Sequence, residues 1–266
     1  MKPMEKPKQL NDLTLLDRFL FASVMEDEET LELALSIIMG EEVRLDVYNV
    51  DDKDRLYDAE VQERNTGNLA KRSRFYQALI DSTLLPPGRG VSFNQLPASY
   101  LIMIMPFDLW GCGKYRYTFK TQCEEVPGLY LEDGVTRIFL NTRGTDDGEV
   151  SPELTELLHY IEDSSDETAQ RCKSGRIQKL HQRVREVRAS EEFGVKYMQA
   201  WEEKIYERME GKEEGLAEGR EEGRELGEQR ISALTRHLLK AGRYDDLERA
   251  AQDPACREAL CREFGL

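Results

Sequence analysis

The chain has 266 residues, of which 39% are hydrophobic and 33% are charged, and its formal net charge at pH 7 is −15. This length accommodates one sizeable folded domain with additions. The acidic total argues against broad electrostatic capture of nucleic acid, which normally leaves a basic footprint. Net charge averages over regions, however, and charged residues crowd the chain after about residue 191. We therefore expect a folded first part and a charged tail.

Cysteine usage and hydropathy indicate the cellular setting. An odd number of cysteines without a Cys-x-x-Cys pair argues against a disulfide framework or a zinc knuckle. The first ten residues are polar, and the longest apolar run, 100–105, is far too short to span a bilayer. A reduced, cytoplasmic setting with no membrane partner is expected. The five cysteines are Cys112, Cys123, Cys172, Cys256 and Cys261.

The first predicted elements are helices. After an N-terminus at 1–11 that is expected to be disordered, apolar residues recur at helical spacing across residues 13–39. Thr30 is expected to cap the second of these helices, and Gly40 to end it.

Alternating apolar and polar residues then predict two strands, at 43–48 and 57–62, around a polar turn near Lys53. In an antiparallel hairpin, the residue numbers of cross-strand partners sum to a constant. This pairing sets Asp46 opposite Glu60, so that the two carboxylates share a face.

The second strand carries Gln62 on the face of Glu60, while Val61 points into the core. Two carboxylates on adjacent strands form a cluster of hard oxygen atoms, which suits Mg²⁺ or Mn²⁺. Such an ion supports phosphodiester hydrolysis. The alternative is an acidic hairpin face that is merely solvated.

A helix is predicted at 69–84, and its inward stripe includes Arg72 and Tyr76, which could meet a phosphate. The alternative for Arg72 is an internal salt bridge to Asp46, Asp58 or Glu60. Asp17, beside the apolar stripe of the first helix, is either a third carboxylate of the cluster or a surface residue. The residues expected to break the helix are Pro86, Pro87, Gly88 and Gly90.

Three further strands complete the predicted sheet. Residues 99–105 are continuously apolar and bounded by prolines, as in a central strand covered on both faces. Additional strands are predicted at 115–121 and 136–141. The fold class is therefore α/β, a mixed sheet flanked by helices over residues 12–148.

The remainder is predicted to be all-helical, with a subdomain at 149–210 and a final helical segment at 230–266. Between them, at 211–229, a glycine recurs every four residues in a charged segment. Glycines and like charges four residues apart disfavour an isolated helix. Self-association, giving a homodimer, would resolve both problems, whereas a frayed linker is the alternative.

Several blocks, in order, resemble the PD-(D/E)XK nuclease family transposases, also called recombination-promoting nucleases. They cover residues from about 12 to 160. The blocks read LTLLDRFLF at 13–21, VRLDV at 43–47, YDAEVQ at 57–62, KRSRFY at 71–76 and DG with FLNT at 133–142. Arg18 departs from the family, which often has an acidic residue there.

The resemblance implies a restriction-endonuclease-like core, in which Asp46 and Glu60 bind a metal ion and the backbone carbonyl of Val61 is a third ligand. Gln62 would occupy the position of the motif lysine as a catalytic residue. An amide neither accepts a proton at neutral pH nor carries lysine's charge, so slow or conditional cleavage is expected.

The implied function is that of a bacterial Mg²⁺- or Mn²⁺-dependent DNA endonuclease whose strand breaks promote recombination. The alternative is a catalytically weak or inactive nuclease-fold module that binds DNA or protein in regulation or phage defence. No feature of the sequence indicates strand transfer.

Two basic segments could contact DNA despite the acidic total. One, beside the proposed metal site, comprises Arg64, Lys71, Arg72 and Arg74, with Tyr76 nearby. The other lies on a predicted helix, which is alternatively an ordinary surface helix. Its candidate phosphate-binding residues are Lys173, Arg176, Lys179 and Arg183.

Overall fold

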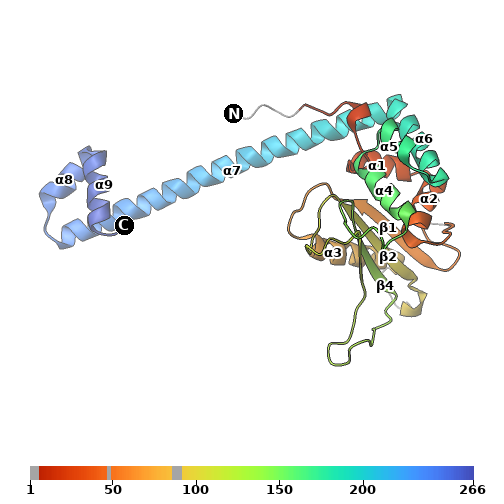
Figure 1. Ribbon diagram of the computed structural model, residues 1–266. Coiled ribbons are helices and arrows are strands. Elements are labelled where there is room, and N and C mark those ends of the chain that lie inside the picture. The colour runs from red at the N-terminus through yellow and green to blue at the C-terminus, as the bar shows by residue number, and fades with distance from the viewer. Residues whose placement is uncertain (1–5, 47–48, 86–91) are drawn as a thin grey trace. The chain divides into compact units, whose positions relative to one another are not determined.

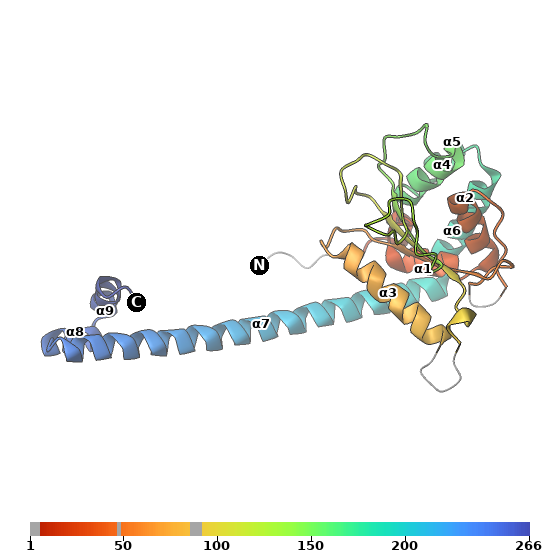
Figure 2. The same cartoon turned by 90° about the horizontal axis from the view of Figure 1, so that it is seen from below.

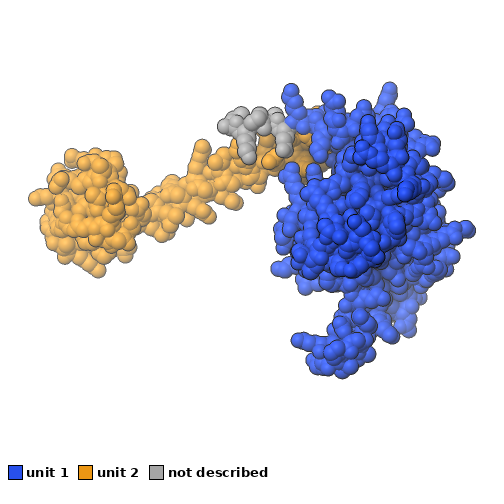
Figure 3. Space-filling model, viewed as in Figure 1, with its two compact units in different colours: residues 1–198 blue, residues 199–266 orange. Residues whose placement is uncertain are grey.

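The computed structural model describes residues 6–46, 49–85 and 92–266. The chain divides into two compact units, residues 1–198 and 199–266 (Figure 3). The first unit contains a sheet flanked by helices and the second is helical, which confirms the predicted α/β fold with an all-helical C-terminal extension. Within the described residues, no helix is long and apolar enough to cross a membrane.

Three predictions reach outside the described residues. The predicted disorder at 1–11 includes residues 1–5, the predicted strand at 43–48 includes residues 47–48, and the helix-breaking Pro86, Pro87, Gly88 and Gly90 fall within 86–91.

The sheet has four strands in the order β1-β2-β4-β3, and Figure 1 labels β1, β2 and β4. Strand β1 (Arg55–Val61) pairs in parallel with β2 (Ala98–Met105), and β2 pairs in parallel with β4 (Val135–Asn141). Strand β3 (Arg116–Phe119) is antiparallel to β4. The apolar β2 is therefore central, as predicted, and β1 is at an edge.

Helices cover the two faces of the sheet unequally. On one face, α1 (Arg18–Met25), α2 (Glu28–Met39), α4 (Pro152–Glu162) and α6 (Gly175–Ala189) contribute to one large apolar core with the sheet. On the other face lies α3 (Leu69–Leu84) (Figure 2). Its Leu69 packs with Met103 and Phe139 of the sheet. The short elements are α5 (Asp166–Arg171) and the 3₁₀ turns Leu10–Asp12 and Phe93–Gln95.

The first two helices begin later than predicted. Helix α1 begins at Arg18, because Asp17 caps its N-terminus, and the apolar residues at 13–16 lie before the helix. Helix α2 begins at Glu28 with Asp27 as its N-cap, so the predicted cap at Thr30 is wrong. Gly40 ends α2 in the left-handed conformation, as predicted.

Helix α3 has the predicted bounds but a rotated buried stripe. Leu69, Ser73 and Gln77 are its buried residues, whereas Leu79 and Thr83, which helical spacing places on the stripe of Arg72 and Tyr76, are exposed. Small and polar side chains occupy the contact with the sheet, and apolar periodicity does not detect them.

The predicted turn forms, but the hairpin does not continue along β1. Val50 bridges Leu56, which is the predicted register about Lys53. However, Leu45 bridges Asp51, and the backbone N–H of Asp46 donates to the carbonyl of Val50 at 2.8 Å. Asp46 is exposed and lies opposite Val50. The predicted pairing of Asp46 with Glu60 is therefore wrong.

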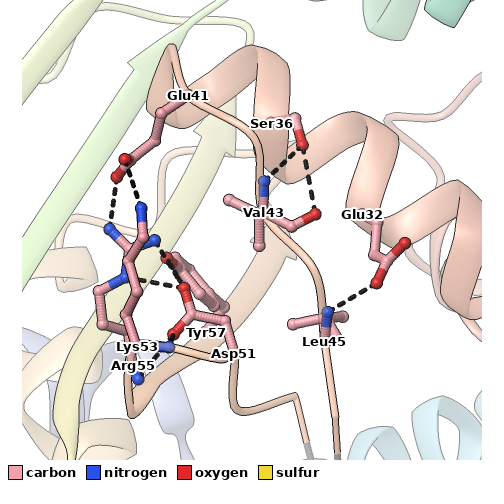
Figure 4. Close-up of polar contacts among 9 residues, drawn as sticks. All are labelled: Glu32, Ser36, Glu41, Val43, Leu45, Asp51, Lys53, Arg55 and Tyr57. Atoms are coloured by element: carbon pink, nitrogen blue, oxygen red, sulfur yellow. Dashed lines mark hydrogen bonds and ion pairs between the residues drawn. The ribbon is translucent and has the colours of Figure 1, made fainter.

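Helix α2 holds the segment before the turn in this arrangement (Figure 4). The Ser36 hydroxyl accepts a hydrogen bond from the backbone N–H of Val43 at 2.9 Å, and the Glu32 carboxylate accepts one from that of Leu45 at 2.6 Å. Val43 is also buried in the core. These contacts tie residues 43–45 to α2, while β1 pairs with β2.

The second unit packs the end of α7 (Glu191–Lys240) against α8 (Tyr244–Gln252) and α9 (Pro254–Glu263). The predicted final helical segment is thus three helices, because Gly242 adopts a left-handed conformation after α7. The glycines at 211–227 lie within α7, and a Cβ added at any of them would meet nothing within 4 Å.

Candidate active site

The candidate site lies on the α3 face of the edge strand β1. Side chains alternate between the two faces of a strand, so Asp58, Glu60 and Gln62 share a face, and Val61 lies in the core on the other. Gln62 is buried, whereas Asp58 and Glu60 are half-buried. The sequence prediction that Glu60 and Gln62 project together, away from Val61, is confirmed.

Glu60 is surrounded by three polar side chains from different elements. The Gln62 amide Nε2 donates to Oε2 of Glu60 at 3.0 Å, and Nη2 of Arg72 lies 4.0 Å from the same oxygen. From the start of α1, Nη2 of Arg18 lies 3.7 Å from Oε1 of Glu60. The glutamate therefore contacts one amide and lies near two guanidinium groups.

Arg72 connects Gln62 to Tyr76. Its Nη1 donates to the Gln62 amide oxygen at 2.6 Å, and its Nη2 donates to the Tyr76 hydroxyl at 2.5 Å. The guanidinium also lies over the Tyr76 ring, 5.3 Å from its centroid. Arg72 and Tyr76 thus face inward as predicted, and the ion-pair alternative for Arg72 is met by Glu60.

Asp58 is a further carboxylate on this face, which the sequence analysis names only as an alternative ion-pair partner of Arg72. Burial, and secondarily the negative charge of Glu60, raises the pKa of Asp58 to about 6, an effect that Arg18 partly offsets. No hydrogen bond to its carboxylate occurs within the described residues. Its place two residues before Glu60 in a strand was the signal that pointed to a shared face.

A groove beside Asp58 separates β1 from the C-terminal half of α3. Its lining is largely apolar, and this surrounding contributes to the desolvation of the Asp58 carboxylate. The lining residues are Asn49, Leu56, Tyr57, Asp58, Leu79, Ile80, Thr83 and Leu84.

The other predicted metal ligands have different positions. Asp46 lies opposite Val50. Asp17 caps α1, with Oδ1 accepting from the backbone N–H of Phe19 at 3.0 Å, and this capping explains its presence there. The backbone N–H of Gln62 donates to β2, so by alternation the carbonyl of Val61 points to the outer edge of β1. Among the described residues, no three His, Cys, Asp or Glu side chains gather as a metal cluster.

The first basic segment is exposed next to this site. Arg64, Lys71 and Arg74 are solvent-exposed and form no ion pair within the described chain. Arg64 lies in the loop after β1, and the other two lie in the first turns of α3. Their positive charge is therefore available to an incoming anion.

The second basic segment is largely paired within the protein. Arg176 lies 3.3 Å from Glu153, and Lys179 lies 3.2 Å from Glu29. Arg183 lies 3.5 Å from Glu186, while Lys173 is exposed. These pairs favour the alternative of an ordinary surface helix, packed on α1 and α2 through its apolar side.

The candidate site thus combines a Glu-x-Gln at the end of an edge strand with an inward arginine, on a mixed sheet. Residues 11–210 match the family model described as PD-(D/E)XK nuclease family transposase. The match spans well over half of the chain, and the protein belongs to this family. The four-stranded sheet flanked by helices fits the family's restriction-endonuclease-like fold. Comparison with curated proteins and with solved structures finds no match.

Proposed function

We propose that the protein is a Mg²⁺- or Mn²⁺-dependent DNA endonuclease whose strand breaks promote recombination. The observation that carries this proposal is the hydrogen-bonded group of Glu60, Gln62, Arg72 and Tyr76 on β1 and α3, in a chain of a nuclease family. It places a carboxylate, an amide and a cation together at one strand end.

The proposed metal ligands on this strand are carboxylate and carbonyl oxygen atoms, which suit a hard divalent cation. Glu60 is the proposed anchoring ligand, with the Val61 carbonyl at the open strand edge as another. Asp58 is the proposed second carboxylate, because it shares the face of Glu60 and has no hydrogen-bond donor among the described residues. Asp46, the carboxylate that the family resemblance suggests, is the competing candidate. When bound, such an ion activates water and stabilises charge on the phosphate.

The remaining residues bind and orient the substrate. Gln62 is neutral and does not act as a general base, but its amide can donate a hydrogen bond to a phosphate oxygen. Arg72 and Tyr76 supply a cation and a hydroxyl next to it. DNA backbone contacts are assigned to Arg64, Lys71 and Arg74, whose charges are unpaired within the described chain.

Plasmid nicking in Mg²⁺ or Mn²⁺ tests the proposal. The wild-type chain is expected to convert supercoiled plasmid to open-circular or linear DNA, and Glu60→Gln to lose roughly 100-fold or more of that rate, because the anchoring carboxylate is gone. Glu258→Gln is the matched control, with the same change of side chain, and should retain the wild-type rate, because its ion pair to Arg230 lies within the second compact unit. Equal rates for wild type and Glu60→Gln would refute the proposal.

A DNA- or protein-binding module without cleavage is the second candidate function. It is favoured by Gln62 in place of the motif lysine and by the separation of Asp46 from its predicted partner. Binding of duplex DNA without nicking under either metal would support it, with a role in regulation or phage defence.

Self-association through α7 is a further part of the proposal. The glycines at 211–227 have open space around them, and Met209, Leu216 and Leu226 are exposed on the same helix. Glycines permit close approach of two helix backbones. If this segment pairs, Gly219→Leu lowers the mass measured by light scattering from dimer to monomer. An unchanged mass in this variant and in the 211–266 deletion would remove the idea.

A further inference from the structure

Given the proposed function, Gln62 stands at the position of the motif lysine, and its contacts indicate which residue supplies the missing positive charge. Its amide lies between two groups of opposite charge. The amide oxygen accepts from Arg72 at 2.6 Å, and the amide nitrogen donates to Glu60 at 3.0 Å. Guanidinium groups only donate hydrogen bonds and carboxylates only accept them. The reversed amide would therefore face both neighbours with the wrong group, so a single orientation is stable.

In this orientation, the positive charge of Arg72 acts on the N–H groups of the Gln62 amide. The positive guanidinium at the amide oxygen polarises the group, which strengthens the N–H groups on the other side. One N–H donates to Glu60, and the second has no partner among the described residues, so it can donate to an oxygen of an incoming phosphate. Gln62 is 7% exposed and the Arg72 side chain 28% exposed, so water screens the pair only in part.

Arg72 itself is held in place by a second contact of its guanidinium. Its other terminal nitrogen donates to the Tyr76 hydroxyl, and the two residues lie one turn apart on α3. A lysine has a single ammonium and lacks this planar fork, so it would not reach the amide and the hydroxyl with the same geometry.

We propose that Arg72 is the positioning residue that allows a glutamine to replace the motif lysine: it orients the Gln62 amide and supplies the missing positive charge to the phosphate. The site then works as a two-residue unit, in which Gln62 provides the directed donor and Arg72 the charge. A lysine at position 62 would make Arg72 largely dispensable.

A double-mutant cycle tests this dependence. Affinity for a labelled duplex is measured by anisotropy in EDTA, and nicking by single-turnover assays in Mn²⁺, for Arg72→Gln with and without Gln62→Lys. In the wild-type background, Arg72→Gln is expected to lower the duplex affinity and the nicking rate about 10-fold each. In the Gln62→Lys background, it is expected to lower each less than about 3-fold. The matched control is Arg74→Gln, which removes the same charge from the same helix and should have equal effects in both backgrounds.

The conservative variant separates positioning from charge. Arg72→Lys is expected to restore duplex affinity to within about 3-fold of wild type while the single-turnover rate stays about 10-fold low, because the charge returns without the fork. Full recovery of both, or an Arg72→Gln effect that is the same in both cycle backgrounds, would overturn the inference.

Two further outcomes are covered: a wild type that does not nick DNA, and a Gln62→Lys variant that does not fold. If the wild type binds the duplex without nicking, the endonuclease proposal fails, and the affinity cycle still decides the role of Arg72; absence of duplex binding overturns both. If Gln62→Lys does not fold, the side-chain amide resonance of Gln62 in protein labelled with ¹⁵N-glutamine replaces the cycle. It should shift in Arg72→Gln and not in Arg74→Gln, and an unchanged resonance in both would overturn the inference.

Discussion

Two aspartates on the same stretch of chain, Asp51 and Asp58, have opposite surroundings. The fully buried Asp51 side chain accepts hydrogen bonds from the backbone N–H groups of Lys53 and Arg55 and from the Tyr57 hydroxyl, at 2.9–3.0 Å (Figure 4). It also pairs with the Arg55 guanidinium at 2.6 Å. Asp58, by contrast, faces Glu60 and receives no hydrogen bond within the described residues.

The surroundings of the two carboxylates indicate different roles for them. A buried carboxylate with its acceptor sites filled stabilises a fold, whereas one left beside another carboxylate stores unfavourable electrostatic energy that a bound cation can relieve. Asp51 therefore organises the turn before β1, whereas Asp58 and Glu60 are the carboxylates that we propose for the cation site.

The largest expected effect on folding is that of Asp51→Asn. The Asn amide would present N–H groups to donors, and among the described residues it would leave the largely buried Arg55 guanidinium with an ion pair only to the half-exposed Glu41. Loss of a buried pair predicts a drop of about 3 kcal/mol in the free energy of unfolding at pH 7, measured by urea denaturation.

The pH dependence of this loss provides a check. Burial opposes ionisation of Asp51, but hydrogen bonds from Arg55 lower its pKa below the ordinary value. Stability from a lowered pKa is present above the unfolded pKa and disappears as pH falls through the folded pKa. The difference between wild type and Asp51→Asn should therefore shrink in acid, and a constant difference would contradict this account of Asp51.

Asp58→Asn is expected to raise the free energy of unfolding, whereas Asp51→Asn lowers it. Because the folded pKa is raised to about 6 from the ordinary value of 3.8, ionisation of Asp58 destabilises the fold progressively as pH rises between these values. The variant should be more stable than wild type by about 2 kcal/mol at pH 8 and equally stable near pH 4, by urea denaturation without divalent ions. Reduced stability at pH 8 would show that the Asp58 carboxylate is satisfied in the fold.

Arg18→Gln should have the smallest effect. Arg18 has a side chain that is 72% exposed and lies 3.7 Å from Glu60, so solvent screens the interaction. We expect a change of less than about 0.5 kcal/mol in unfolding free energy and a small rise in the pKa of Asp58, followed by NMR titration of its carboxyl carbon. A large loss of stability would mean that α1 and β1 depend on this pair.

Local periodicity was sufficient to predict much of this site from the sequence. The spacing of Glu60 and Gln62 in a strand, and of Arg72 and Tyr76 in a helix, set the faces on which they lie. Each inference needed only the period of one element, and the structure brings these four residues together as expected.

What the sequence did not predict depends on contacts between distant elements. The position of Asp46 follows from hydrogen bonds of Glu32 and Ser36 to the backbone at 43–45, which have no local signature. Strand β1 pairs along its whole length with β2, whose paired residues are more than forty positions away in the chain, and it meets the adjacent segment only near the bridge of Val50 with Leu56 among the described residues. A hairpin was the simpler expectation, and tertiary hydrogen bonds overrode it.

Binding of Mn²⁺, measured by calorimetry on the intact protein without DNA, tests the central claim that Asp58 and Glu60 together accept a cation. We predict that Glu60→Gln and Asp58→Asn each weaken the affinity roughly 10-fold or more, as loss of a charged ligand should, and that Asp46→Asn has a smaller effect. Wild-type affinity in Asp58→Asn, with loss in Asp46→Asn, would contradict the account and assign the second carboxylate to Asp46.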